Sequence, residues 1–116
     1  MFVVMIRTRL RADADLSAYE ALNARMEQLL RDIPGFVDVK GYASPDGDEL
    51  GMVRFETLEA LHVWRDLPEH RRAQERGRTE FYAAYRIEVC EVVRAYAFAE
   101  GRYVTAPSDT ASRSAR

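Results

Sequence analysis

Apolar and polar residues alternate along several segments of the chain, and this pattern is typical of strands with one buried face. Residues 36–44 and 49–55 alternate in this way on either side of 45–48, whose Pro-Asp-Gly-Asp sequence is a strong turn signal. Residues 2–10 alternate as well, and one side of them is nearly all apolar: Phe2, Val4, Ile6, Thr8 and Leu10. The pattern predicts a first strand followed later by a hairpin.

Apolar residues recur at helical spacing in the segment between the first strand and the hairpin. Ser17 is the predicted N-cap of this helix, and Glu20 completes a capping box with it. The helical pattern ends at 34–35, a Pro-Gly pair that cannot continue a helix. We therefore expect one amphipathic helix that covers the sheet.

A second helical region follows the hairpin. Thr57 is its predicted N-cap, and the apolar stripe behind it consists of Leu58, Leu61, Trp64 and Leu67. Pro68 is expected to interrupt the helix because it has no N–H to donate. Gly77 is expected to cap the second piece, and residues 79–84 to form a turn or a short helix.

Residues 85–98 form the longest alternating run and predict one continuous last strand. The resulting order is strand, helix, strand, strand, helix pair, strand. This βαββαβ order predicts an α+β, ferredoxin-like fold whose antiparallel sheet has both helices on one face. We expect residues 1–100 to form this single domain and residues 101–116, which are small and polar, to be a disordered tail.

The other face of the predicted sheet is too apolar to remain in water. The last strand is also longer than the shorter strands beside it can pair. A second copy of the chain would cover this face and pair with the unpaired end of the last strand, so we expect a homodimer.

Composition narrows the functional classes. The net charge of −2 over 116 residues gives no electrostatic footprint for nucleic acid or for an acidic membrane. No segment approaches the ~20 apolar residues of a membrane span, and the first residues lack a signal-peptide pattern. These features predict a cytoplasmic protein. Cys90 is the only cysteine, and its apolar surroundings predict a small buried side chain.

The common catalytic motifs are absent from the sequence. It contains no CxxC or HExxH metal motif, no GxGxxG or phosphate loop, and no nucleophile elbow. The chain is also too short for a flavin or nicotinamide domain of its own. We therefore expect no metal and no bound cofactor, and any catalysis has to use a few side chains and the reactivity of the substrate.

The stretch 60–86 holds the only Trp and both His residues. The run WRDLPEHRRAQERGRTEFYAAYRIEV, with PGF after the first helix and FET before the second, resembles the antibiotic-biosynthesis monooxygenase family of dimeric α+β barrel proteins. The resemblance covers residues 2–98. The family contains cofactor-free oxygenases that oxidise electron-rich phenolic or anthrone-like polyketides, haem-degrading enzymes and members without an assigned role.

The resemblance implies a monooxygenase that acts on an aromatic polyketide or quinone-type substrate with molecular oxygen. Trp64 matches the pocket Trp of the family, and His62 and His70 are the candidate bases. Thr8 matches a polar position on the first strand. The side chains that could hold an anionic oxygen are Arg71, Arg86, Tyr82 and Tyr85.

Two departures from the family pattern keep other functions open. Ala60 stands where anthrone-oxidising relatives carry an Asn, and Gln74 stands where haem-degrading relatives carry a ligand His. The alternatives are a non-catalytic ligand-binding or pathway-accessory dimer, and then a haem-handling protein. Trp64 on an apolar stripe is also compatible with a simple core role. If a site exists, we expect it between the sheet and the two helical segments, with Trp64 in its wall.

Overall fold

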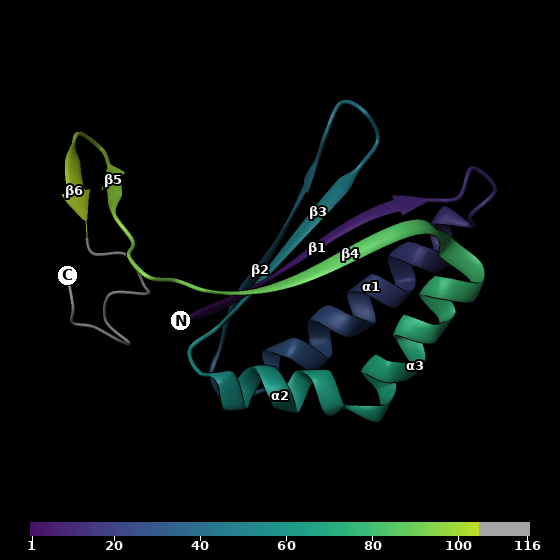
Figure 1. Cartoon of the computed structure of the whole chain (residues 1–116), viewed down its shortest axis with the longest axis horizontal. Helices are drawn as coiled ribbons and strands as arrows, with labels where there is room; N and C mark the ends of the chain where they lie inside the picture. The colour runs from purple at the N-terminus through teal and green to yellow at the C-terminus, as the bar shows by residue number, and fades with distance from the viewer. Residues whose placement is uncertain (105–116) are drawn as a thin grey trace.

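The computed structural model describes residues 1–104, and the predicted tail from 105 onward lies outside the described residues. Figure 1 shows the arrangement of the elements. In chain order these are β1 (Phe2–Leu10), α1 (Leu16–Arg31), β2 (Phe36–Ala43), β3 (Glu49–Phe55), α2 (Leu58–Asp66), α3 (Pro68–Arg76), η1 (Gly77–Phe81), β4 (Tyr82–Glu91), β5 (Ala97–Ala99) and β6 (Arg102–Val104).

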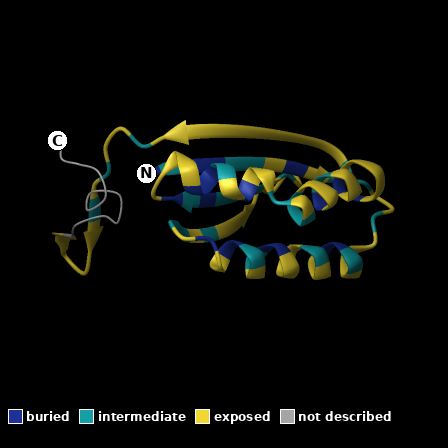
Figure 2. Cartoon of the chain, turned by 90° about the horizontal axis from the view of Figure 1, so that it is seen from below, coloured by how far each residue is buried: buried dark blue, intermediate teal, exposed yellow. Residues whose placement is uncertain are grey.

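The main sheet has the strand order β2-β3-β1-β4, and each neighbouring pair is antiparallel. This order confirms the ferredoxin-like α+β fold, because β1 and β4 pair while the β2–β3 hairpin extends the sheet on the other side of β1. Figure 2 shows the long helix α1 below the sheet, with its buried positions turned toward the strands.

The core lies between the sheet and the helices and is densest near the start of β1. Val4 and Val53 face the helices from neighbouring strands, and the Phe55 side chain is fully enclosed. The helices contribute Leu30, Leu61 and Trp64 to the same cluster, and Ile33 joins it from the turn after α1. Gly35 has φ +94 and lies so close to α2 that a Cβ would come within 2.8 Å of Ala60 Cβ. Because Gly35 has no side chain, the chain can enter β2 directly beside α2.

Local cap signals were right for one helix and wrong for the other. Thr57 caps α2 as predicted, since its hydroxyl accepts from the N–H of Ala60 at 3.1 Å. In α1 the cap is Asp15, whose carboxylate accepts from the N–H of Ala18 at 3.0 Å. Ser17 already lies inside the helix, so the predicted capping box does not form. Asp15 has the extended backbone that a cap requires, and it is reached first along the chain.

Gly77 does not cap α3 in a left-handed conformation, because its φ is −55 and the chain continues into the π-helical turn η1. Arg11 stabilises this turn by donating to the carbonyls of Thr79 and Arg78 at 2.9 Å each. The glycine is instead required for space, since a Cβ on it would overlap the ring of Tyr82. Of the turn or short helix expected over 79–84, residues 79–81 belong to η1, whereas 82–84 already belong to β4.

The predicted continuous strand over 85–98 is wrong at both ends. Strand β4 begins at Tyr82 and stops at Glu91, and a short β5–β6 hairpin follows. Strand β4 pairs only with β1, and the last bond is from the N–H of Val92 to the carbonyl of Met1 at 3.0 Å. The domain boundary expected at residue 101 falls inside the hairpin, which extends away from the body (Figure 1).

The sheet face turned away from the helices mixes apolar and charged side chains. Met5 and Met52 are partners across β1 and β3, and Leu50 and Tyr42 are partners across β3 and β2. Tyr42 is 51% exposed in the single chain. Cys90 lies on this face opposite Val3 and is exposed, so the prediction of a buried thiol is wrong for the single chain.

Candidate functional site

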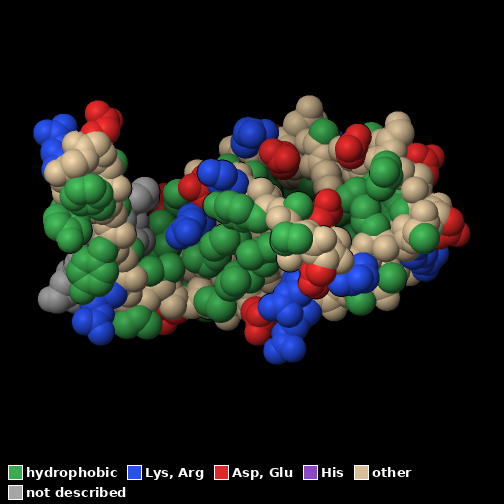
Figure 3. Space-filling model, turned by 90° about the horizontal axis from the view of Figure 1, so that it is seen from above, with side chains coloured by type: hydrophobic (Ala, Val, Ile, Leu, Met, Phe, Trp, Pro, Cys, Tyr) green, Lys and Arg blue, Asp and Glu red, His purple; other side chains and the backbone are tan. Residues whose placement is uncertain are grey.

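A pocket of about 630 Å³ lies where the sequence placed it, between the sheet and the helices, with Trp64 in its wall. Its size falls in the range of small-molecule sites. Strand β1 contributes Ile6 and Thr8, and β4 contributes Tyr82 at its first residue. Figure 3 shows the surface hollowed beside the β2–β3 turn, with carboxylates near the rim.

Trp64 and His70 contact each other in the pocket wall. Trp64 is buried, and the two rings stack with centroids 3.8 Å apart and planes inclined by 23°. His70 Nδ1 also lies 3.0 Å from the backbone carbonyl of Trp64. A carbonyl only accepts hydrogen bonds, so the proton of this bond is on Nδ1. The imidazole is thus fixed both by a ring face and by a hydrogen bond.

Burial lowers the pKa of His70 below its ordinary value of 6.5, and the hydrogen bond to Trp64 opposes this shift only in part. The ring is therefore neutral at neutral pH. With Nδ1 protonated, Nε2 carries the lone pair, and no partner for it is found within residues 1–104. His70 can accept a proton from a molecule in the pocket.

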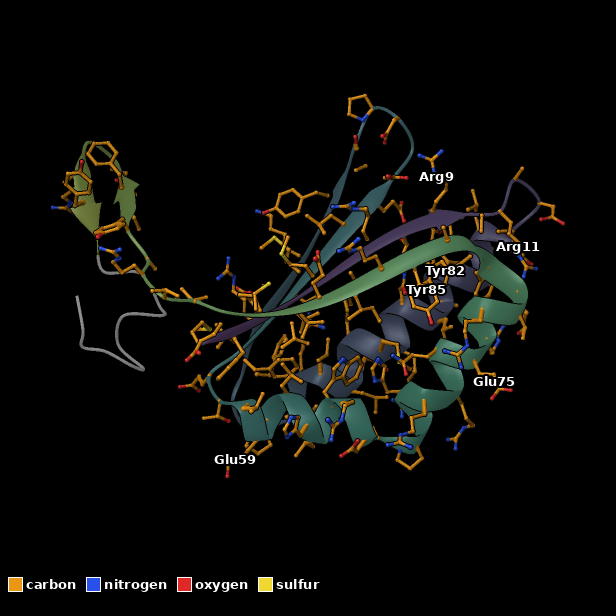
Figure 4. The ribbon with its side chains drawn as sticks, viewed as in Figure 1. Arg9, Arg11, Glu59, Glu75, Tyr82 and Tyr85 are labelled. Carbon is orange, nitrogen blue, oxygen red and sulfur yellow. The ribbon has the colours of Figure 1, made fainter. Side chains whose placement is uncertain are left out.

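Two tyrosines provide the polar groups at the other side of the pocket. The Tyr19 and Tyr82 hydroxyls are 3.4 Å apart, and their rings meet edge to face. Burial, followed by the hydrogen bond with Tyr19, raises the pKa of Tyr82 well above its ordinary value. Tyr82 is therefore an uncharged phenol that can donate a hydrogen bond. Figure 4 shows it at the start of β4 beside Tyr85.

Thr8 is the buried polar residue of the core region, with 5% of its surface exposed. It lines the pocket, and its Cα partners are Glu49 on β3 and Tyr85 on β4. Among the residues that the structure describes, its hydroxyl has no hydrogen-bond partner. A buried hydroxyl without a partner costs free energy, and a polar ligand atom in the pocket would supply the partner.

The charged residues along the pocket are mainly acidic. Glu20, Glu27 and Glu49 are among the lining residues. Lys40 borders the pocket as well, but its ammonium lies 5.7 Å from the Tyr42 ring on the sheet face turned away from the helices. Glu27 pairs with Arg31 at 3.6 Å, and the carboxylates of Glu20 and Glu49 disfavour a ligand that already carries a negative charge. The pocket favours a neutral molecule.

The structure separates the residues expected at the site into two groups. Trp64, His70, Tyr82 and Thr8 come together in the pocket wall. The others lie outside it: His62 is half-buried on α2, Tyr85 is 42% exposed and receives a hydrogen bond from Arg78, Arg71 pairs with Asp66, and Arg86 pairs with Glu88. Neither of the two arginines expected to hold an anion reaches the pocket.

The lining residues that were not among the sequence candidates include Tyr19, Asn23 and Gln74. Tyr19 and Asn23 are four residues apart on α1, so they occupy one face and could have been recognised as a polar interruption of its apolar stripe. Gln74 follows His70 by four residues on α3 and shares its face for the same reason. It lines the pocket at the place where haem-degrading relatives would carry a ligand histidine.

Two general searches of the described residues complete the description of the site. Within residues 1–104, no group of three or more His, Cys, Asp or Glu side chains is placed to hold a metal ion. None of the helices in this part of the chain is long and apolar enough to cross a membrane.

Comparison with known proteins identifies relatives by sequence and by fold. The family described as "Antibiotic biosynthesis monooxygenase" matches residues 1–76. The uncharacterized protein YqjZ of Bacillus subtilis is 32% identical over 84 residues, which are 72% of this chain and 74% of that protein.

Solved structures show the same fold at low sequence identity. Rv0793 from Mycobacterium tuberculosis superposes with a TM-score of 0.71 at 23% identity, covering 81% of this chain and 96% of its own. SnoaB, a cofactor-independent oxygenase from Streptomyces nogalater, has a TM-score of 0.67 at 12% identity and covers 81% of this chain and 94% of its own. The extent of the family match and the identity to YqjZ together show that this chain belongs to the antibiotic biosynthesis monooxygenase family.

Proposed function

We propose that the protein is a small cofactor-independent monooxygenase that oxidises a neutral, electron-rich aromatic compound of the anthrone or phenol class with molecular oxygen. The observation that carries the proposal is the His70 imidazole, neutral and with a free Nε2, stacked on Trp64 in the wall of the pocket. The fold shared with SnoaB, described as a cofactor-independent oxygenase, adds support.

The proposed reaction needs one base and one group that stabilises an anion. His70 Nε2 takes a proton from the benzylic carbon or phenol, and the resulting carbanion reduces oxygen by one electron. The substrate radical and superoxide combine to a peroxide, which takes up a proton and loses water to give the quinone. Anthrone and one O₂ thereby give anthraquinone and one H₂O.

Two features of the pocket suit such a substrate. Tyr82 and Thr8 offer hydroxyls to the oxygen atom on which negative charge develops, and they do so away from bulk water. The Trp64 ring offers a flat apolar surface to a planar ligand. The acidic rim disfavours a carboxylated ligand and is compatible with a phenol that becomes charged only during reaction.

The experiment measures oxygen uptake with anthrone. The chain supplies a matched pair of variants, because its two histidines lie inside and outside the pocket. His70→Gln is expected to lower kcat/KM by roughly 10²- to 10⁴-fold, the contribution of a general base. His62→Gln is expected to keep the rate of the unaltered protein.

Equal loss in both variants, or in neither, would reject His70 as the base. Anthrone binding without oxygen uptake, followed through quenching of the single tryptophan, would favour the alternative of a non-catalytic ligand-binding protein.

The proposal includes a homodimer formed through the sheet face that turns away from the helices. Met5, Met52, Leu50 and Tyr42 provide its apolar part. An obligate interface of this kind buries about 2,000 Å² or more. Sedimentation at micromolar concentration is expected to show a dimer, and Met52→Glu is expected to weaken it. A monomeric protein would reject this part of the proposal.

A further inference from the structure

The backbone carbonyl of Trp64 lacks its regular helical partner. In an α-helix this carbonyl would accept the N–H of the residue four positions on. That residue is Pro68, which has no N–H. The helix breaks there, with Leu67 extended at φ −61 and ψ 126. Instead, the carbonyl oxygen accepts hydrogen bonds from the N–H of Leu67 at 3.3 Å and from His70 Nδ1 at 3.0 Å.

This carbonyl decides which nitrogen of His70 carries the proton. Because it can only accept, the bond requires an N–H on Nδ1, and a neutral imidazole then has its lone pair on Nε2. The stacking on Trp64 fixes the plane of the ring, and the hydrogen bond fixes its rotation in that plane. Trp64 thereby positions His70 through both its side chain and its backbone.

We propose that Pro68 is a positioning residue: by withholding an N–H from the Trp64 carbonyl, it reserves this acceptor for His70 Nδ1 and presents an unprotonated Nε2 to the pocket. The use of that nitrogen as a base rests on the proposed function, whereas the tautomer is a property of the free protein. Pro68 also begins α3, the helix that carries His70.

The prediction is tested by long-range ¹H–¹⁵N correlation spectra of the labelled full-length protein at about pH 8.5, where histidine is neutral. The chain has two histidines, and the spectrum of His70→Gln assigns them. We expect His70 to show the Nδ1–H tautomer. In Pro68→Ala, where residue 68 regains an N–H, we expect the ratio of Nδ1–H to Nε2–H to fall by about five- to tenfold, the effect of one hydrogen bond.

Pro34→Ala is the matched control, since Pro34 lies in the exposed turn after α1 and does not line the pocket. It is expected to leave the His70 spectrum unchanged. A wild-type His70 protonated on Nε2 would overturn the proposal without the use of any variant. An unchanged tautomer ratio in a folded Pro68→Ala would overturn the role of Pro68.

The tautomer and the proposed function can fail separately. The spectra need no substrate, and oxygen uptake with anthrone is a different measurement. An Nδ1–H tautomer in a protein without turnover would uphold the positioning role and reject the oxygenase. An Nε2–H tautomer in an active protein would reject the positioning role and uphold the oxygenase.

Discussion

The two ends of the helix-facing side of the sheet are built from the same strands but have different interiors. At one end, Phe55 is fully enclosed and packs edge to face with Phe36 at 6.2 Å. At the other end, the space between the same strands and helices remains open as a pocket. The backbone is common to both ends, so the difference lies in the side chains.

Three of the four strands that border the pocket, β1, β2 and β3, carry small or polar residues on this face beside it. On β2 the series is Val39, Gly41 and Ala43. On β3 it is Val53, Gly51 and Glu49, and on β1 it is Val4, Ile6 and Thr8. A Cβ added at Gly41 would meet no atom within 4 Å. The pocket exists because side chains that would fill it are absent.

The largest effect is expected at the packed end. Phe55→Ala should lower the free energy of unfolding by about 3–5 kcal/mol, because the surrounding sheet and helices cannot relax enough to fill the cavity. Urea denaturation measures the loss. A change below about 1 kcal/mol would mean that this end is not close-packed.

Trp64 lies at the boundary between the two ends and should affect both properties. Trp64→Phe is expected to cost about 1–3 kcal/mol of unfolding free energy and also to reduce anthrone turnover per folded molecule, since the ring stacks on His70. Leu61→Val, one helical turn earlier and outside the pocket, should cost stability alone. Thermal melts and oxygen uptake on both variants separate the effects. Unchanged turnover in Trp64→Phe would make Trp64 a core residue only.

Filling the pocket with a larger side chain should stabilise the protein and weaken ligand binding. Gly41→Val is expected to raise the unfolding free energy by about 0.5–1 kcal/mol, because glycine weakens a strand and the new side chain enters free space. The same change should reduce anthrone binding, measured by tryptophan quenching. Gly41→Ala should give smaller shifts in both measurements. Undiminished binding in the valine variant would place the ligand elsewhere.

The smallest effect concerns pH. Because burial lowers the pKa of His70, the unfolded chain binds this proton more readily than the folded protein does. The resulting loss of stability begins as the pH falls through the ordinary value of 6.5 and is complete below the lowered pKa. The pH dependence of unfolding should therefore be shallower in His70→Gln between these values. Identical slopes in the two proteins would show that His70 is not desolvated.

The fold could be predicted from the sequence to a large extent because its signals act over a few residues. Alternation in 2–10, the turn at 45–48, the Thr57 cap and the break at Pro68 each depend on neighbours within one turn or one strand. Even the loss of the regular helical partner of the Trp64 carbonyl follows from a proline four positions later. The resemblance of the 60–86 stretch then gave the family, which the comparisons confirm.

The tertiary structure alone decided which candidates share a pocket and where the last strand ends. Arg71 and His70 are adjacent in sequence, yet one pairs with Asp66 at the surface while the other lies against Trp64. Strand β4 ends at Glu91, opposite Phe2 of β1, although the alternating pattern continues to residue 98. A helical or strand period fixes the face of a residue within its own element. The volume left between elements depends on side chains far apart in the chain, so only the folded arrangement reveals it.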